Sequence, residues 1–149
     1  MLFSQLSPAQ LIRLRNNGVT PEYVRQMRAA GFANADPDQL VRLRSHGVGP
    51  EYVREMREAG LGDLSPDALV RLRNSGVHAS YVAAMRGLGL ADLDVNQLAR
   101  LCCHGVTPEF VEEMRALGFA ELTAEDLRRL KDHGVSADFV KAMRQLDYA

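Results

Sequence analysis

The side chains best suited to chemistry on their own are two thiols and an imidazole in a row, Cys102, Cys103 and His104. Such groups bind zinc, or act as nucleophiles when a base lies beside a thiolate. Adjacent residues on a helix point about 100° apart, so the two thiols meet one ion poorly. His46 and His133 occupy positions matching His104, but each helix-packing step of about 8–10 Å places them too far away to share its ion. We therefore predict free thiols and no metal, cofactor or catalytic residue.

Arginine recurs without exception in two sets of positions spaced 29 residues apart. The first set, here called the arginine ladder, is Arg13, Arg42, Arg71, Arg100 and Arg129. The second set is Arg28, Arg57, Arg86, Arg115 and Arg144. The second set falls in the last turn of a predicted helix at the edge of its apolar face, where arginine favours the helix dipole, so we interpret it as structural. The ladder falls on an outer face and is the candidate partner-binding site.

Stacked helices about 8–10 Å apart would turn the ladder into a stripe roughly 40 Å long. Such a stripe suits an extended acidic peptide or a phosphate backbone. The alternative is ordinary helix surface, because Asp38–Arg42, Asp67–Arg71 and Glu125–Arg129 are acid-before-base pairs at i, i+4. Arg13 and Arg100 have Ala9 and Asn96 at that spacing, so pairing within a helix does not explain every copy.

The 29-residue spacing extends to the whole chain and divides it into five copies, 6–34, 35–63, 64–92, 93–121 and 122–149. Equivalent positions in the copies are called a column. Two columns are entirely leucine: Leu11, Leu40, Leu69, Leu98, Leu127 and Leu14, Leu43, Leu72, Leu101, Leu130. A glycine column follows them at Gly18, Gly47, Gly76, Gly105 and Gly134. Self-similarity at such a period is typical of a repeat array.

Each copy contains the signals of two short helices. Ser7 is a good N-cap, Pro8 suits the first helical position and Gln10 completes a capping box, so a helix is predicted over about residues 8–17 and ends at Gly18. The same pattern from Thr20 and Pro21 predicts a second helix that ends at Gly31. The sequence thus predicts an all-α fold, a right-handed αα-hairpin solenoid of about ten short helices that forms a single array.

Two further columns bear on packing. Ile12, Val41, Val70 and Ala99 are followed by Arg128, so we expect this column to face the following copy and Arg128 to face water as a terminal cap. Residues 1–5, through Leu2 and Phe3, are expected to form a lid over the first copy. The aromatic column, Tyr23, Tyr52, Tyr81, Phe110 and Phe139, has helical spacing relative to the methionines and is expected in the core.

Composition narrows the function. The net charge of −1 gives no global field to hold nucleic acid or an anionic membrane. The sequence contains no HExxH, Walker, GxSxG or GxGxxG motif, so no enzyme is predicted. The chain shows no run of transmembrane length, and because the apolar start Met1-Leu2-Phe3 is too short for a signal peptide, no secretory signal is expected. Two adjacent thiols fit a reducing cytosol, so a cytoplasmic protein is expected.

The segment His46-Gly47-Val48-Gly49-Pro50-Glu51-Tyr52-Val53-Arg54-Glu55-Met56-Arg57 resembles short helical repeats of bacterial signalling proteins. They lie beyond the peptidase domain of beta-lactam-sensor-type antirepressor metallopeptidases. The likeness covers residues 6–149, and the zinc motif of those peptidases is absent. The resemblance implies a regulatory or interaction array.

A weaker likeness is to transcription-activator-like effector repeats. It places Asn16-Asn17 and Ser45-His46 where those repeats read bases. The phosphate-approaching stretch of that family is replaced here by Gly18-Val19-Thr20-Pro21, and Cys103-His104 and Asp132-His133 fit no expected pair. Gly47-Val48-Gly49 is also similar to helix-hairpin-helix DNA binders, in copy two alone.

Two functions remain open. Variable pairs on the second helix of each copy are Arg25-Gln26, Arg54-Glu55, Ala83-Ala84, Glu112-Glu113 and Lys141-Ala142. Variation of exposed residues over a constant set of packing residues favours a monomeric scaffold that binds a protein or peptide. The partner is expected to be acidic if the ladder binds it, and no binding to a membrane is expected. The alternative is nucleic-acid binding by the ladder or by the loops that end the first helices.

Overall fold

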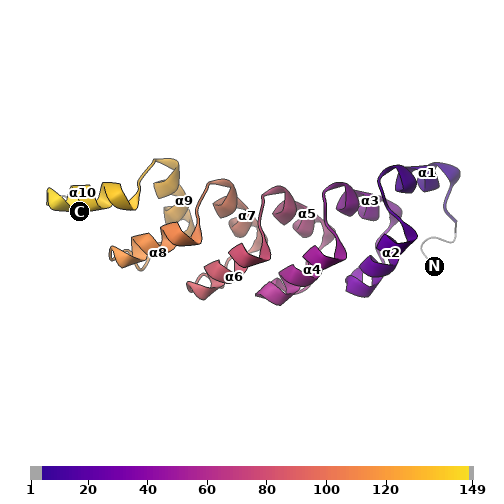
Figure 1. Ribbon diagram of the computed structural model, residues 1–149, viewed down its shortest axis with the longest axis horizontal. Coiled ribbons are helices and arrows are strands. Elements are labelled where there is room, and N and C mark those ends of the chain that lie inside the picture. The colour runs from indigo at the N-terminus through magenta and orange to yellow at the C-terminus, as the bar shows by residue number, and fades with distance from the viewer. Residues whose placement is uncertain (1–4, 148–149) are drawn as a thin grey trace. The chain divides into compact units, whose positions relative to one another are not determined.

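The protein is all-helical. The computed structural model describes residues 5–147, and this part contains ten α-helices and no strand (Figure 1). Leu2 and Phe3, the predicted lid, lie outside the described residues.

The helices alternate as the repeat predicts. The first helices of the five copies are α1 (Pro8–Asn16), α3 (Pro37–Ser45), α5 (Pro66–Asn74), α7 (Val95–Cys103) and α9 (Ala124–Asp132). The second helices are α2 (Pro21–Met27), α4 (Pro50–Met56), α6 (Ala79–Gly87), α8 (Pro108–Ala116) and α10 (Ala137–Gln145). Wider turns, Arg28–Phe32 and Arg57–Leu61, extend α2 and α4.

The caps of α1 form as predicted. The Ser7 hydroxyl accepts from the Gln10 amide, and the Gln10 side chain accepts from the Ser7 amide. At the other end Gly18 has φ 73°, and the Val19 amide donates to the Leu14 carbonyl at 2.9 Å. This left-handed residue and its six-to-one hydrogen bond satisfy carbonyls that the helix leaves open.

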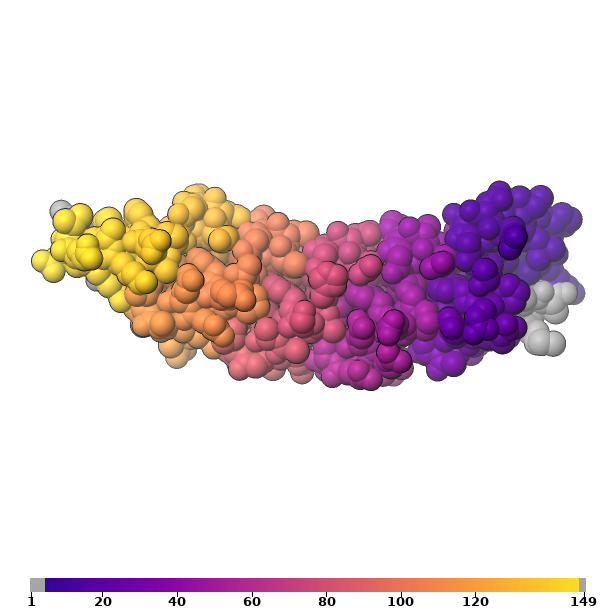
Figure 2. All heavy atoms as spheres, in the orientation of Figure 1, coloured from indigo at the N-terminus to yellow at the C-terminus, as the bar shows by residue number. Residues whose placement is uncertain are grey.

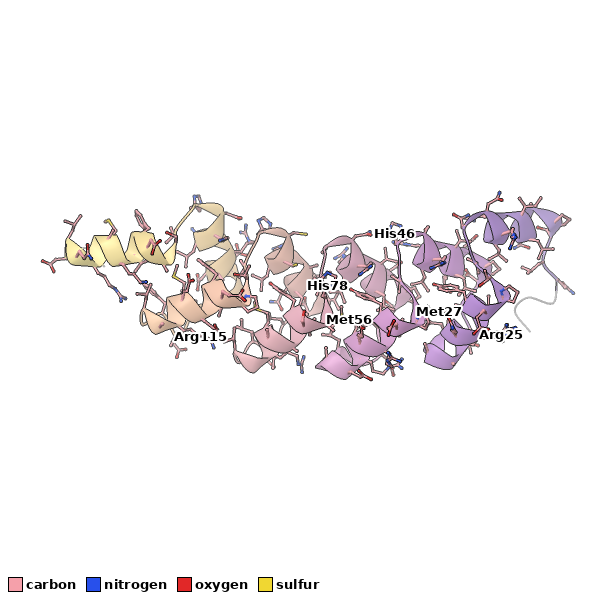
Figure 3. All side chains as sticks on the ribbon, viewed as in Figure 1. Arg25, Met27, His46, Met56, His78 and Arg115 are labelled. Atoms are coloured by element: carbon pink, nitrogen blue, oxygen red, sulfur yellow. The ribbon has the colours of Figure 1, made fainter. Side chains whose placement is uncertain are left out.

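The chain divides into two compact units, Met1–Asn74 and Ser75–Ala149. In the first unit α1 packs on α3 and α3 on α5, while α2 packs on α4 (Figure 1). Leu43 of α3 is fully buried, as are Met27 and Met56, which Figure 3 labels on α2 and α4. The leucine and methionine columns therefore form the core that the spacing predicts.

The second unit repeats this packing. In it α7 packs on α9, α6 on α8 and α8 on α10. Its core includes Met85, Leu101, Met114 and Leu127, each at most 2% exposed. Figure 2 shows the atoms of neighbouring helices closely packed within each unit.

The predicted orientation of the Ile12 column is wrong. Although α3 packs on α1, Ile12 is 60% exposed, whereas Val41, its equivalent on α3, is 6% exposed. A residue facing the following copy would show the opposite pattern, so this column faces the preceding copy. Arg128 accordingly is not a cap facing water: its side chain is 23% exposed and pairs with Glu125 and Asp132.

Two glycines close together on the loop before α4 should respond oppositely to substitution. Gly47 has φ 76°, so Gly47→Ala should destabilise the protein by about 1–2 kcal/mol. Gly49 is the N-cap of α4, has φ −104° and leaves that helix without a side-chain cap. A Cβ atom there meets no other atom within 4 Å, so Gly49→Ser should stabilise by a few tenths of a kcal/mol. Urea denaturation of both variants checks this, and a stabilising Gly47→Ala would contradict it.

Candidate binding surfaces

The ladder arginines reach from one copy to the next. In the first unit Arg13 pairs with Asp38, and Arg42 Nη1 lies 2.7 Å from Asp67 Oδ1. Both acids stand in the first turn of the next copy's first helix. For Asp38–Arg42 the predicted pairing within one helix is therefore wrong, and the contact between copies explains why Arg13 is an arginine opposite Ala9.

In the second unit the acid equivalent to Asp38 and Asp67 is bonded within its own helix. This acid is Glu125, and Arg128 donates to it. This hydrogen bond is the main cause that lowers the pKa of Glu125, with smaller contributions from the charges of Arg100 and Arg129. Arg129 itself lines a pocket beside Leu130 and Val135.

The ladder contacts are largely exposed, which limits their contribution to stability. The Arg42 and Asp67 side chains are 53% and 76% exposed. Surface pairs of this kind contribute about 0–1 kcal/mol. We expect the double-mutant cycle of Arg42→Ala and Asp67→Ala, measured by urea denaturation, to give a coupling below about 1 kcal/mol that shrinks in high salt. A larger coupling that does not respond to salt would contradict this assignment.

Arginines of the second column bond backbone carbonyls, which fits the structural role expected of them. Arg57 Nη2 donates to the Ala30 carbonyl at 2.8 Å, and Arg115 and Arg144 donate to the carbonyls of Leu88 and Leu117. Each of these carbonyls lies at the end of the preceding copy's second helix. The arginines thus satisfy acceptors that a helix C-terminus leaves open.

A third set of cations was not singled out in the sequence. Arg44 lies over the Tyr23 ring at 5.4 Å and Arg73 over Tyr52 at 5.2 Å in the first unit. Lys131 lies over Phe110 at 5.0 Å in the second. These separations fit cation–π contacts. Their signal is a column of Arg15, Arg44, Arg73 and Lys131, in which Cys102 is the exception.

The aromatic column lies mainly in the core, as expected. Tyr23 is 5% exposed, and its hydroxyl donates to the Val48 carbonyl at 2.7 Å. Burial raises the pKa of Tyr23 to about 12, partly offset by the charge of Arg44. Tyr81 makes the same hydrogen bond to Val106. The face of Tyr23 is covered by Arg44 and its hydroxyl is used, so this ring offers little surface on which a base could stack.

The histidine column lies in the loops that end the first helices, where Figure 3 labels His46. His46 Nδ1 lies 3.0 Å from Asn74 Oδ1 in the first unit. His104 Nδ1 lies 2.7 Å from Asp132 Oδ1 in the second. Each imidazole thus meets a polar side chain of the next copy.

The cysteines next to His104 are free thiols, with Cys103 exposed and Cys102 partly covered. Burial, followed by the charge of Cys103, raises the pKa of the Cys102 thiol, which disfavours a nucleophilic thiolate. Within residues 5–147 no three His, Cys, Asp or Glu side chains are grouped to hold a metal ion.

A groove lies on the layer of second helices in the first unit. It has a volume of about 750 Å³ between the last turn of α2 and the first turn of α4. Its residues are Gln26, Ala29, Ala30, Gly49, Pro50, Glu51, Arg54 and Arg57. Gln26 and Arg54 belong to the variable pairs noted above, and both are exposed. The small side chains make the groove, and a mixture of amide, carboxylate and guanidinium groups borders it.

Comparison with known proteins gives no relative: no family model, no curated protein and no solved structure matches the chain. Among the described helices, none combines the length and apolar character required to cross a bilayer.

Proposed function

We propose that the protein is a non-enzymatic helical-repeat scaffold, a regulatory module that binds another protein through the exposed face of its second helices. The observation that carries this proposal is the contrast within α2, α4, α6, α8 and α10. Their methionine column is buried at Met27, Met56, Met85 and Met114, while all ten positions of the variable pairs are exposed. Constant packing under a variable surface is how repeat proteins build different binding sites.

The arginine ladder supports this location indirectly. Arg13 and Arg42 are already paired with carboxylates, so an acidic peptide would have to displace Asp38 and Asp67. The α2–α4 groove is hollow and bordered by Gln26, Glu51 and Arg54. A polypeptide segment with both polar and small apolar side chains fits such a surface better than a uniformly acidic one. The adjacent free thiols support a reducing cytosol as the setting.

The test is affinity capture on the immobilised protein from bacterial cytosol, with and without nuclease treatment. We expect a specific protein to be retained in both cases. Recovery that disappears after nuclease treatment would overturn the proposal, because the partner would then be held through nucleic acid.

Nucleic-acid binding is the second candidate function. It is favoured by the polar side chains in the loops that end the first helices. Asn74 and His46 meet where α3 and α5 end in the first unit, so polar side chains of two successive copies lie together there. A salt titration with mixed-sequence oligonucleotides separates the two functions. Binding that falls steeply with salt would favour nucleic acid, since each neutralised phosphate adds about 0.9 to the slope on duplex DNA.

A further inference from the structure

Two faces of the repeat remain uncovered by any described helix, and they differ in kind. On α1, Leu11 is 53% exposed and Ile12 60% exposed. Their equivalents on α3, Leu40 and Val41, are 2% and 6% exposed because α3 packs on α1. Leu11 and Ile12 therefore belong to the surface that a copy presents to the preceding one, here called the leading face.

The complementary surface is exposed in copy five, on α9 and α10. Leu130 and Val135 are half-buried, whereas Leu43 and Val48 in the same columns are fully buried. Phe139 is 52% exposed, against 5% for Tyr23 in its column. These residues form the surface that a copy presents to the following one, here called the trailing face. It carries a pocket of about 360 Å³ that is lined by Leu122, Asp126, Arg129, Leu130, His133 and Val135.

We propose that the leading face of one molecule docks on the trailing face of a second molecule of the same chain. The contacts between copies inside each unit provide the pattern. Leu11 and Ile12 enter the pocket beside Leu130 and Val135, as the equivalent residues of α3 pack on α1. Both surfaces are apolar at their centres and polar at their edges, as stable interfaces are.

The polar groups at the two edges also match. Arg15 belongs to the column of Arg44, which lies over Tyr23, so it is placed to lie over the exposed Phe139 ring. Asn16 belongs to the column of Asn74, the partner of His46. It is therefore placed to bond His133 at the pocket rim.

Two contacts found between copies are missing at this junction. At the junction Arg129 of one molecule would lie opposite Ala9 of the other. Within the chain, the equivalent arginines Arg13 and Arg42 pair with Asp38 and Asp67. Phe139 has no hydroxyl to donate, unlike Tyr23, which bonds the Val48 carbonyl. The junction therefore lacks two contacts of the interface between copies one and two, so we expect it to be weaker than that interface and reversible. Because the two faces differ, one junction uses one face of each molecule, and the other face of each can take part in a further junction. This departs from the monomer expected from the sequence and is independent of the proposed scaffold function.

The test is the weight-average mass of the protein by sedimentation, over roughly a hundredfold range of concentration. We expect the mass to rise continuously with concentration. Ile12→Arg blocks the leading face and Phe139→Glu the trailing face, so each variant alone should stay monomeric. An equimolar mixture should form dimers that grow no further, because each variant keeps one intact face.

Ala83→Arg, on the exposed surface of α6, is the matched control and should associate like the unmodified protein. Circular dichroism verifies that the variants fold, and Ile12 and Phe139 are exposed enough for this to be expected. An unmodified protein that stays monomeric over the whole range would overturn the proposal without any variant. A mixture of the two variants that stays monomeric would overturn it as well.

Discussion

Leu72→Ala should lower the free energy of unfolding by about 2–5 kcal/mol, among the largest effects of any single substitution in this chain. Leu72 lies on α5 and is 0% exposed. Its truncation removes transfer free energy and leaves a cavity that surrounding side chains fill only in part. Urea denaturation followed by circular dichroism measures the change, with the slope of the transition reported beside the midpoint.

Leu130→Ala is the matched comparison, because Leu130 occupies the same column on α9. It is half-buried beside an open pocket, so its truncation should cost less than half as much. Leu146→Ala, at a side chain that is 65% exposed, should change stability little. Equal losses at Leu72 and Leu130 would show that burial within the columns does not determine stability.

Local features of the fold could be predicted because they depend on residues close in sequence. Ser7 with Gln10 and the glycine column give the helix ends directly, since capping involves residues three to six positions apart. The leucine and methionine columns give the buried face because helical periodicity is local too. The arrangement as one solenoid of five copies stays a prediction.

Contacts between copies could not be derived in the same way. The period shows that Ile12 is on an apolar face, but not which neighbour covers that face. Arg42 has one acid four residues before it, Asp38, and another 25 residues after it, Asp67. The stacking of the helices brings Asp67 to the Arg42 guanidinium, and this cannot be derived from the spacing. The sequence shows that Arg44 belongs to a column of cations, but only the packing shows that Arg44 reaches the Tyr23 ring.

The α2–α4 groove could not be predicted either, because its shape depends on the distance between two helices. Ala29 and Gly49 are small, but small residues form a groove only where larger side chains surround them. The sequence does not show which side chains are neighbours in space. The variable positions Gln26 and Arg54 were identified from the sequence, and the structure adds that they border a hollow.

Blocking that groove is the second large effect we expect. Ala29→Trp places an indole in the α2–α4 groove, from an exposed position in the turn Arg28–Phe32 that follows α2. Affinity for the captured partner should fall at least about tenfold, which corresponds to about 1.4 kcal/mol. Biolayer interferometry with the purified partner measures the change. Ala83→Trp, which adds the same side chain to the exposed surface of α6, is the control and should bind nearly as well as the unmodified protein. An equal loss from both substitutions would mean that the groove is not the contact.

The most direct test of the account is the affinity of one partner for the groove variant and for the ladder variant, measured side by side. The ladder variant carries Arg42→Ala, Arg71→Ala and Arg100→Ala together. If the exposed face of the second helices is the binding surface, the ladder variant should bind within about twofold of the unmodified protein while Ala29→Trp loses at least about tenfold. The opposite result, with binding lost in the ladder variant at an unchanged melting temperature and kept in Ala29→Trp, would contradict the account and assign the site to the arginine ladder.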